Sequence, residues 1–165
     1  MNKTDEATFV AFVESSSPAL LRTAWFLTGD RHLAEELVQE SYERAYVTWR
    51  RISTGSPYGY VRRTLVNLHT DRWRRRHGEV AMAALPERAA PSVQTASDDR
   101  DQIVRLLQTL PKREREVVVL RYYANLSEQE TADTLGVSVG TVKSSASRGL
   151  AALRDALNSN SEVKR

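Results

Sequence analysis

The stretch from Leu126 to Leu153, LSEQETADTLGVSVGTVKSSASRGLAAL, decides the fold of the C-terminal half of the chain. Ser127 is a favourable N-cap residue, and Glu130 three positions later completes a capping box, so a short helix begins here. Gly136 follows where that helix must end in a left-handed turn. Ser138 then caps a second helix. The stretch therefore predicts two short helices joined by a tight turn.

The second of these helices has two different faces. An apolar face is formed by residues that recur at helical spacing: Val142, Ala146, Leu150, Leu153 and Leu157. The opposite face is short, polar and mildly basic, as expected of a helix that lies in the major groove of DNA. The residues predicted to contact DNA are Ser138, Thr141, Lys143, Ser144, Ser145, Ser147 and Arg148. The alternative is a helical hairpin whose polar helix is merely solvated.

Composition limits the remaining function classes. The chain has 165 residues, no cysteine and a formal net charge of +3. The length allows one domain or two small ones, and the absence of cysteine excludes disulfides and thiolate chemistry. The three histidines are scattered and have no partners at metal-ligand spacing, so we expect no metal or other cofactor. Because we find neither a membrane-spanning segment nor a signal peptide, we expect a cytoplasmic protein.

Amphipathic helical patterns fill the first half of the chain. The stripe formed by Phe9, Phe12 and Val13 predicts a helix that ends before Pro18. A second apolar stripe, from Leu20 to Leu27, predicts a separate helix that Gly29 ends. Asp30 is then placed to cap the next helix, which shows the clearest pattern of all.

The helix after the predicted Asp30 cap has one apolar and one acidic face. The apolar face consists of Ala34, Leu37, Val38, Ser41, Tyr42, Ala45 and Trp49. The other face consists of Glu35, Glu36, Gln39, Glu40, Glu43 and Arg44. An acidic face can simply be solvated. It can also be a docking surface for a basic or polar partner, and the residues alone leave both readings open.

A loop over residues 52–57 separates this region from a long, arginine-rich helix, predicted to run from about Tyr58 to Arg76. Val61, Leu65 and Leu68 should pack inward. The rest of the helix carries Tyr58, Tyr60, Arg62, Arg63, Asn67, Arg72, Trp73, Arg74, Arg75 and Arg76. Arginines neutralise phosphates and aromatic rings stack on unpaired bases, so the combination indicates single-stranded or melting DNA. The alternative is a basic surface helix whose Tyr60 and Trp73 belong to the core.

Residues 78–98 differ in character from their neighbours. They are rich in Ala, Ser and Pro and lack sustained periodicity, which predicts a flexible linker. The helical pattern resumes afterwards with Ile103, Leu106, Leu107 and Leu110, and Pro111 starts a further helix whose core side includes Val117 and Leu120. We therefore predict an all-α fold of two small helical bundles, residues 5–77 and 99–158, joined by that linker.

In this order, the sequence blocks resemble the bacterial RNA polymerase sigma factors of the extracytoplasmic-function (ECF) class, the short two-domain type. The first bundle carries the resemblance in LTGDRHLAEELVQESYERAY (27–46) and YVRRTLVNLHTDRWRRR (60–76). The second bundle carries it in LPKREREVVVLRYYANLSEQETADTLGVSVGTVKSSASRGLAALR (110–154). Two such blocks with a linker between them are more specific than either alone.

The resemblance implies a non-enzymatic subunit that docks on core RNA polymerase and recognises and melts promoter DNA. Docking on the polymerase clamp helices would use Glu36, Gln39 and Glu40. The minus-ten element, with a base flipped out at a cost of a few kcal/mol, would be bound by Tyr58, Tyr60, Arg63, Asn67, Asp71, Arg74, Arg75 and Arg76. The second domain would read the minus-thirty-five element, and the linker would run towards the RNA exit path. An anti-sigma protein is a further candidate partner.

Four residues depart from the family pattern. Tyr60 stands where many members have Trp, and Thr131 where Ile is usual. The threonine should cost about 1 kcal/mol of apolar burial if its hydroxyl finds a local backbone partner. Ser145 stands where Arg is common and Ala146 where Leu is common, so we expect weaker or unusual recognition of the upstream element.

Two other functions compete with this interpretation. A LuxR-type transcription regulator would explain the C-terminal helix-turn-helix, but it would leave the acidic and arginine-rich helices of the first half unexplained. An enzyme acting on nucleic acid would need a metal-binding carboxylate cluster, a phosphate-binding glycine loop or a nucleophile motif, and the sequence shows none of these.

Overall fold

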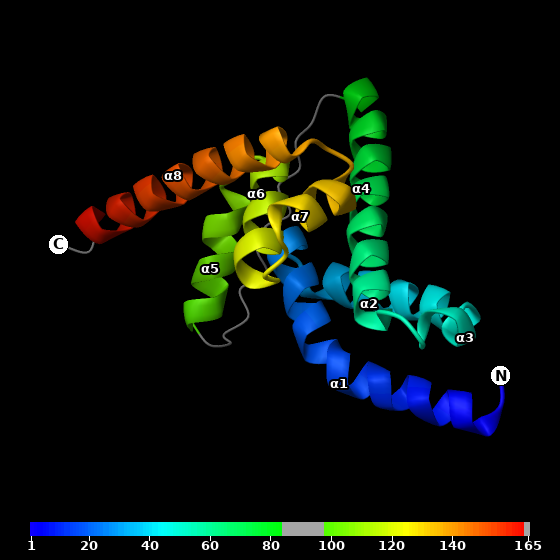
Figure 1. Cartoon of the computed structure of the whole chain (residues 1–165). Coiled ribbons are helices and arrows are strands. Elements are labelled where there is room, and N and C mark those ends of the chain that lie inside the picture. The colour runs from blue at the N-terminus through cyan, green and yellow to red at the C-terminus, as the bar shows by residue number, and fades with distance from the viewer. Residues whose placement is uncertain (84–97, 164–165) are drawn as a thin grey trace. The chain divides into compact units, whose positions relative to one another are not determined.

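The structure, a computed structural model, describes residues 1–83 and 98–163. All regular structure in these two ranges is helical (Figure 1), which confirms the predicted all-α class. The chain divides into two compact units, as the two predicted bundles require. Unit 1 comprises Met1–Ala24 and Asp30–Ser92, and unit 2 comprises Trp25–Gly29 and Val93–Arg165. Most of the predicted linker, residues 84–97, lies outside the described residues.

Unit 1 is built from α1 (Lys3–Thr28) as far as Ala24, α2 (Arg31–Val47), α3 (Trp49–Ile52) and α4 (Pro57–Ala83). Helices α2 and α4 pack against each other. The predicted apolar face of α2 is buried as expected, and so is the predicted inner stripe of α4. The buried residues include Leu37, Val38, Ala45, Trp49, Val61, Leu65 and Leu68. Helix α4 begins at Pro57, one residue before the predicted start, and it continues past Arg76 to Ala83, so the first residues of the predicted linker are helical.

The predicted break at Pro18 is wrong, because α1 continues through this proline and bends along its length (Figure 1). A proline inside a helix costs about 3 kcal/mol, since it removes a hydrogen bond and crowds the preceding turn. Here the hydroxyls of Ser16 and Ser17 donate to carbonyl oxygens one turn earlier, at 2.7 and 2.6 Å. Both hydroxyls also meet the Tyr42 hydroxyl of α2, at 2.7 and 3.1 Å. Packing against α2 thus stabilises the continuous helix.

Unit 2 contains α5 (Asp98–Gln108), α6 (Lys112–Val118), the π-helix η1 (Val119–Tyr123), α7 (Glu128–Leu135) and α8 (Val139–Val163). Its core includes Val104, Leu107, Leu110, Val117, Val119, Leu120, Leu126 and Val142. On α5 the inward face is displaced by one residue from the prediction, because Val104 is buried and Ile103 is 45% exposed.

The π-helix is a feature that the sequence pattern did not predict. It ends with a backbone hydrogen bond from Ala124 N to Val119 O of 3.0 Å, after which Asn125 adopts a left-handed conformation with φ of 58°. This turn brings Leu126 N within 2.9 Å of Leu120 O, to which it donates. Asparagine tolerates this conformation better than most residues, so it can end a helix where glycine is the usual choice. The turn sets the direction in which the chain enters α7.

None of the described helices is long and apolar enough to cross a membrane. Within the same residues, we find no group of three or more histidine and carboxylate side chains that could hold a metal ion.

Candidate nucleic-acid interface

Helices α7 and α8 form the predicted helix-turn-helix. The Ser127 hydroxyl accepts a hydrogen bond from Glu130 N at 3.0 Å and so caps α7. Gly136 ends that helix in a left-handed conformation with φ of 68°. The Ser138 hydroxyl then accepts from Thr141 N at 3.1 Å and caps α8. These local signals depend on residues close in sequence, which is why the sequence alone could predict them.

The helix-turn-helix is held on α6 by a small apolar cluster. Val117, Ala132, Val142 and Ala146 form its buried centre. Thr131 is also fully buried, and its hydroxyl donates to Ser127 O at 2.8 Å. The expected local partner for this hydroxyl is therefore present, so replacing the usual isoleucine leaves no unsatisfied polar group there.

Most of the predicted DNA-contacting residues of α8 lie on its exposed side: Lys143, Ser144, Ser147 and Arg148 are exposed and Thr141 is half-buried. Ser138 is exposed as well, but its hydroxyl is used by the helix cap. The Arg148 Nε donates to Glu114 Oε1 of α6 at 3.2 Å, and its side chain remains 63% exposed. An arginine held in this way is oriented while still accessible to a phosphate or a base edge.

The predicted exposure of Ser145 is wrong, because its relative exposure is 0% and its hydroxyl has no hydrogen-bond partner. Ser145 shares the inner side of α8 with Val142 and Gly149, at helical spacing. Helix α6 approaches this side so closely that a Cβ atom on Gly149 would meet a methyl group of Val118 at 2.8 Å. The prediction considered only the hairpin of α7 and α8, which leaves this side of α8 open. Helix α6 covers that side, so Ser145 is not available for a DNA contact.

The predicted apolar stripe of α8 is buried at Val142 and Ala146, but two of its later leucines turn outward. Leu150 and Leu157 are 37% and 47% exposed, although both were expected to face the core. The buried side turns instead towards Ser145 and Gly149, where α6 lies.

One side of α4 gathers five of the eight residues predicted to bind the minus-ten element. Tyr60, Arg63, Asn67, Asp71 and Arg74 are spaced three or four residues apart, so they follow one side of the helix. All are exposed except Tyr60, which is half-buried. The opposite side is the buried stripe on α2. We call these five residues the α4 DNA face.

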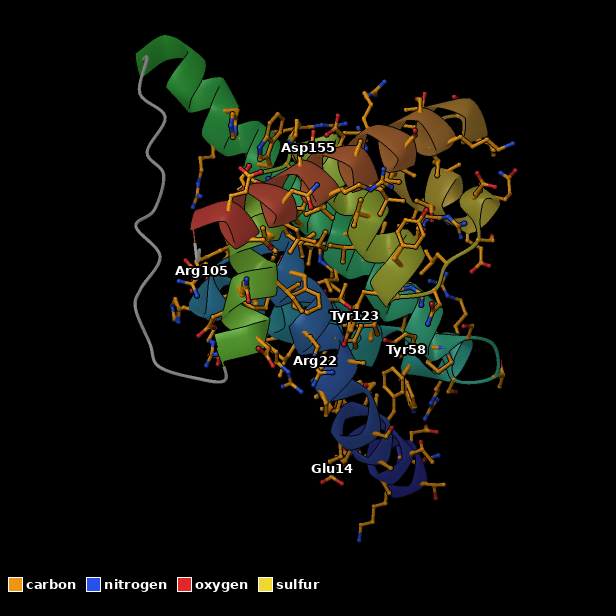
Figure 2. All side chains as sticks on the ribbon, turned by 90° about the vertical axis from the view of Figure 1, so that its left-hand side faces the viewer. Glu14, Arg22, Tyr58, Arg105, Tyr123 and Asp155 are labelled. Carbon is orange, nitrogen blue, oxygen red and sulfur yellow. The ribbon has the colours of Figure 1, made fainter. Side chains whose placement is uncertain are left out.

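The other three predicted residues do not belong to this face. Tyr58 and Arg76 each lie nine residues from Asn67, which is about two and a half turns and places them on the opposite side of the helix. Tyr58, labelled in Figure 2, lies in the first turn of α4, and the guanidinium carbon of Arg62 is 5.3 Å from its ring centroid. Arg75 lies beside the α4 DNA face rather than within it.

Trp73 adds an aromatic group near the exposed end of the arginine run. It is 36% exposed, and its ring stacks on that of His77 with centroids 3.9 Å apart. Neither Tyr60 nor Trp73 is fully buried, which counts against the alternative that both are core residues. Trp73 and His77 are four residues apart on the helix, and this i, i+4 spacing is the sequence signal that could have predicted their stacking.

The acidic face of α2 holds the three residues predicted to dock on polymerase. Glu36 and Gln39 are exposed and Glu40 is half-buried. Gln39 Nε2 donates to Glu43 Oε1 at 3.4 Å. Glu36 and Glu40 each accept a hydrogen bond of 3.1 Å from Arg72 of α4. The sequence had placed Arg72 only among the basic residues of its own helix, so this link between the two helices was missed.

Comparison with known proteins decides the family. The description "Sigma-70 region 2" matches residues 12–79, and "Sigma-70, region 4" matches residues 100–153. The chain belongs to the sigma-70 family of RNA polymerase sigma factors. The region 2 match covers the helices that a LuxR-type regulator would leave unexplained, so it excludes that alternative. A sigma factor serves transcription initiation and is not an enzyme, which also removes the enzymatic alternative.

Individual relatives place this sigma factor in the ECF class. It is 38% identical over 151 residues to the RNA polymerase sigma-E factor of Streptomyces coelicolor, covering 90% of this chain and 85% of the relative. It is 31% identical to the ECF RNA polymerase sigma factor SigL of Mycobacterium tuberculosis, covering 87% and 85% of the two chains.

Solved structures agree with this assignment. The sigma factor RpoE of Bartonella quintana, solved in complex with the anti-sigma factor NepR, has a TM-score of 0.75 and 26% identity. The match covers 92% of this chain and 97% of that one. CnrH, solved with the cytosolic domain of CnrY, has a TM-score of 0.65 at 21% identity and supports the fold alone.

Proposed function

We propose that unit 1 of this sigma factor docks on core RNA polymerase through Glu36, Gln39 and Glu40 and binds the minus-ten element through α4. The observation that carries this proposal is the packing of α2 against α4. It joins an acidic face and an arginine-rich face in one helical pair, so a single rigid element can hold the polymerase and the promoter together. Because both partners are found there, we place the protein in the cytoplasm.

The α4 DNA face would bind the non-template strand as the duplex opens. Arg63 and Arg74 can neutralise phosphates, while Tyr60 offers a ring on which an unpaired base can stack. Asn67 and Asp71 supply hydrogen-bonding groups between these positions. Tyr58, Arg75 and Arg76 lie off this line, so we assign them to the adjoining backbone or duplex rather than to the same strand.

The helix-turn-helix of unit 2 would read the minus-thirty-five element from the major groove. Lys143, Ser144, Ser147 and Arg148 are the exposed groups that can reach base edges and phosphates. Thr141 lies beside them, and Ser138 fixes the start of the helix. Residues 5–77 would thus carry polymerase docking and the minus-ten contact, and residues 99–158 the upstream contact, with residues 78–98 as the connection.

An anti-sigma protein is a further partner that we propose for this chain. The structural relative RpoE was solved bound to such a protein, and its likeness covers nearly the whole of both chains. Binding of this kind would compete with polymerase or with DNA.

The docking proposal is tested by replacing Gln39 and Glu40 with alanine and measuring the affinity for core RNA polymerase. We expect weaker binding, because both side chains belong to the proposed contact, with the helical circular dichroism unchanged. The control is Glu35→Ala, which removes a charge from the same helix outside the three docking residues. Unchanged affinity of the double variant would contradict the proposed docking face.

A further inference from the structure

A row of four charged side chains and one histidine crosses from α2 to α4 in unit 1. Glu36 Oε2 accepts from Arg72 Nη1 at 3.1 Å, and Glu40 Oε2 accepts from Arg72 Nη2 at 3.1 Å. The other oxygen of each carboxylate also meets a nitrogen atom of a side chain on α2 itself. His32 Nε2 lies 3.0 Å from Glu36 Oε1, and Arg44 Nη2 lies 3.1 Å from Glu40 Oε1.

Arg72 occupies its place because of the register of α4. Val61, Leu65 and Leu68 form the buried stripe of this helix, and Arg72 stands at the next position, four residues after Leu68. Its side chain is therefore aimed at α2 along the seam between the helices, and only 34% of it is exposed. The planar guanidinium fork can donate to two carboxylates at once, which a lysine ammonium on its flexible stem does less well.

Glu36 and Glu40 have an inner partner on α4, Arg72, and outer partners on α2 itself, His32 and Arg44. The inner and outer partners differ in exposure. Arg72 is the shielded partner of both, whereas the side chains of His32 and Arg44 are 82% and 56% exposed. Exposed polar and ionic pairs within one helix contribute little to stability, so a cationic group of a partner can readily replace these outer side chains. The inner contacts come from a different helix and hold two like charges, one turn apart, in fixed positions.

We propose that Arg72 is a positioning residue of the polymerase-docking face. It holds the inner oxygens of Glu36 and Glu40 and leaves their outer oxygens for a basic side chain of the partner, which replaces His32 and Arg44. The unit of two glutamates and Arg72 carries a net charge of −1, which suits a cationic contact. This inference rests on the proposed docking through Glu36 and Glu40. It adds a residue from the DNA-binding helix to that site.

The test compares Arg72→Ala with Arg44→Ala in the full chain, by measuring association and dissociation rates with core RNA polymerase. Each variant removes one positive charge next to Glu40, so a purely electrostatic effect would make both bind a basic partner more tightly. We expect opposite results. Arg72→Ala should weaken binding about five- to tenfold through faster dissociation, because two side chains must now be ordered on binding. Arg44→Ala should tighten binding by about twofold, because it removes a competing cation.

Arg72→Lys separates positioning from charge and from folding. It keeps the positive charge and most of the aliphatic stem but loses the guanidinium fork. Compared with Arg72→Ala, it should therefore recover more of the thermal stability than of the polymerase affinity. If both alanine variants tighten binding, or if Arg72→Ala leaves dissociation unchanged, the positioning role is overturned. It is also overturned if Arg72→Lys restores wild-type dissociation.

The failure of this inference can be distinguished from failure of the docking proposal. If Gln39→Ala with Glu40→Ala weakens polymerase binding and Arg72→Ala does not, only the positioning role fails. If neither variant weakens binding, the docking face itself is wrong and the inference fails with it.

Discussion

The two candidate DNA-binding helices of this sigma factor, α4 and α8, expose different chemistry. On α4, the ring of Tyr60 is followed along one side by Arg63, and a run of three arginines occupies residues 74–76. On α8, small hydroxyl side chains dominate, and Lys143 and Arg148 supply the positive charge of the predicted contact. The difference suits the two proposed tasks, because an opened strand is held by phosphate and stacking contacts, whereas a duplex is read at its base edges.

The same comparison shows what decides which residues a helix exposes. The inner side of α4 rests on α2, and five of its eight predicted residues align on the opposite side. Helix α8 packs against α6 as well as α7, so its buried side is broader than the hairpin alone indicates. Ser145 was lost from the predicted interface for that reason.

The largest expected effect comes from reversing the charge of Arg74, Arg75 and Arg76 to glutamate. These residues lie in the C-terminal half of α4, where we expect DNA to melt, so open-complex formation should slow by more than about tenfold and lose salt dependence. Closed-complex binding should change less, because the contacts of α8 remain. Stopped-flow fluorescence of a labelled promoter separates the two steps. A proportional loss in both steps would argue against a role in melting.

A smaller effect is expected from single changes on α8. Lys143→Ala or Arg148→Ala should weaken binding to a duplex carrying the upstream element by roughly 1–3 kcal/mol, the usual cost of losing one base-contacting side chain. Asp155→Ala, on the same helix outside the predicted contact, is a matched control. Fluorescence anisotropy at fixed salt measures the change. Wild-type affinity in both variants would remove these residues from the interface.

The smallest effect is expected from Ser145→Ala. The direction of the change in stability and in DNA affinity distinguishes a buried Ser145 from a Ser145 that contacts DNA. Because the buried hydroxyl has no partner, alanine should leave DNA affinity unchanged and stabilise unit 2 by about 1 kcal/mol. Thermal unfolding and the same anisotropy measurement check both values. Ser147→Ala is the exposed counterpart on the same helix. A loss of affinity in Ser145→Ala alone would return this residue to the DNA surface.

Features set by short-range signals could be predicted from the sequence. The caps at Asp30, Ser127 and Ser138 and the left-handed end at Gly136 depend on neighbours within a few residues, and all four are present in the structure. The apolar face of α2 was also correct, because its pattern is long and regular.

Features that are set by contacts between residues distant in the sequence could not be predicted. Pro18 was expected to end a helix, but hydroxyl contacts with Tyr42 accompany the continuous one. Ser145 was expected on the surface, but α6 covers it. Arg72 was grouped only with the basic residues of its own helix, although it donates to the carboxylates of another helix. In each case the neighbour that decides the outcome is far away in the sequence.

Run-off transcription with purified core RNA polymerase, with and without this protein, on a genomic fragment library is the most direct test. If two helical surfaces on separate units hold the same promoter while unit 1 binds the polymerase, adding the protein should produce transcripts from defined start points. Those start points should share two upstream sequence elements at a constant spacing. Start points that are unchanged by the protein, or that share no such elements, would contradict the account.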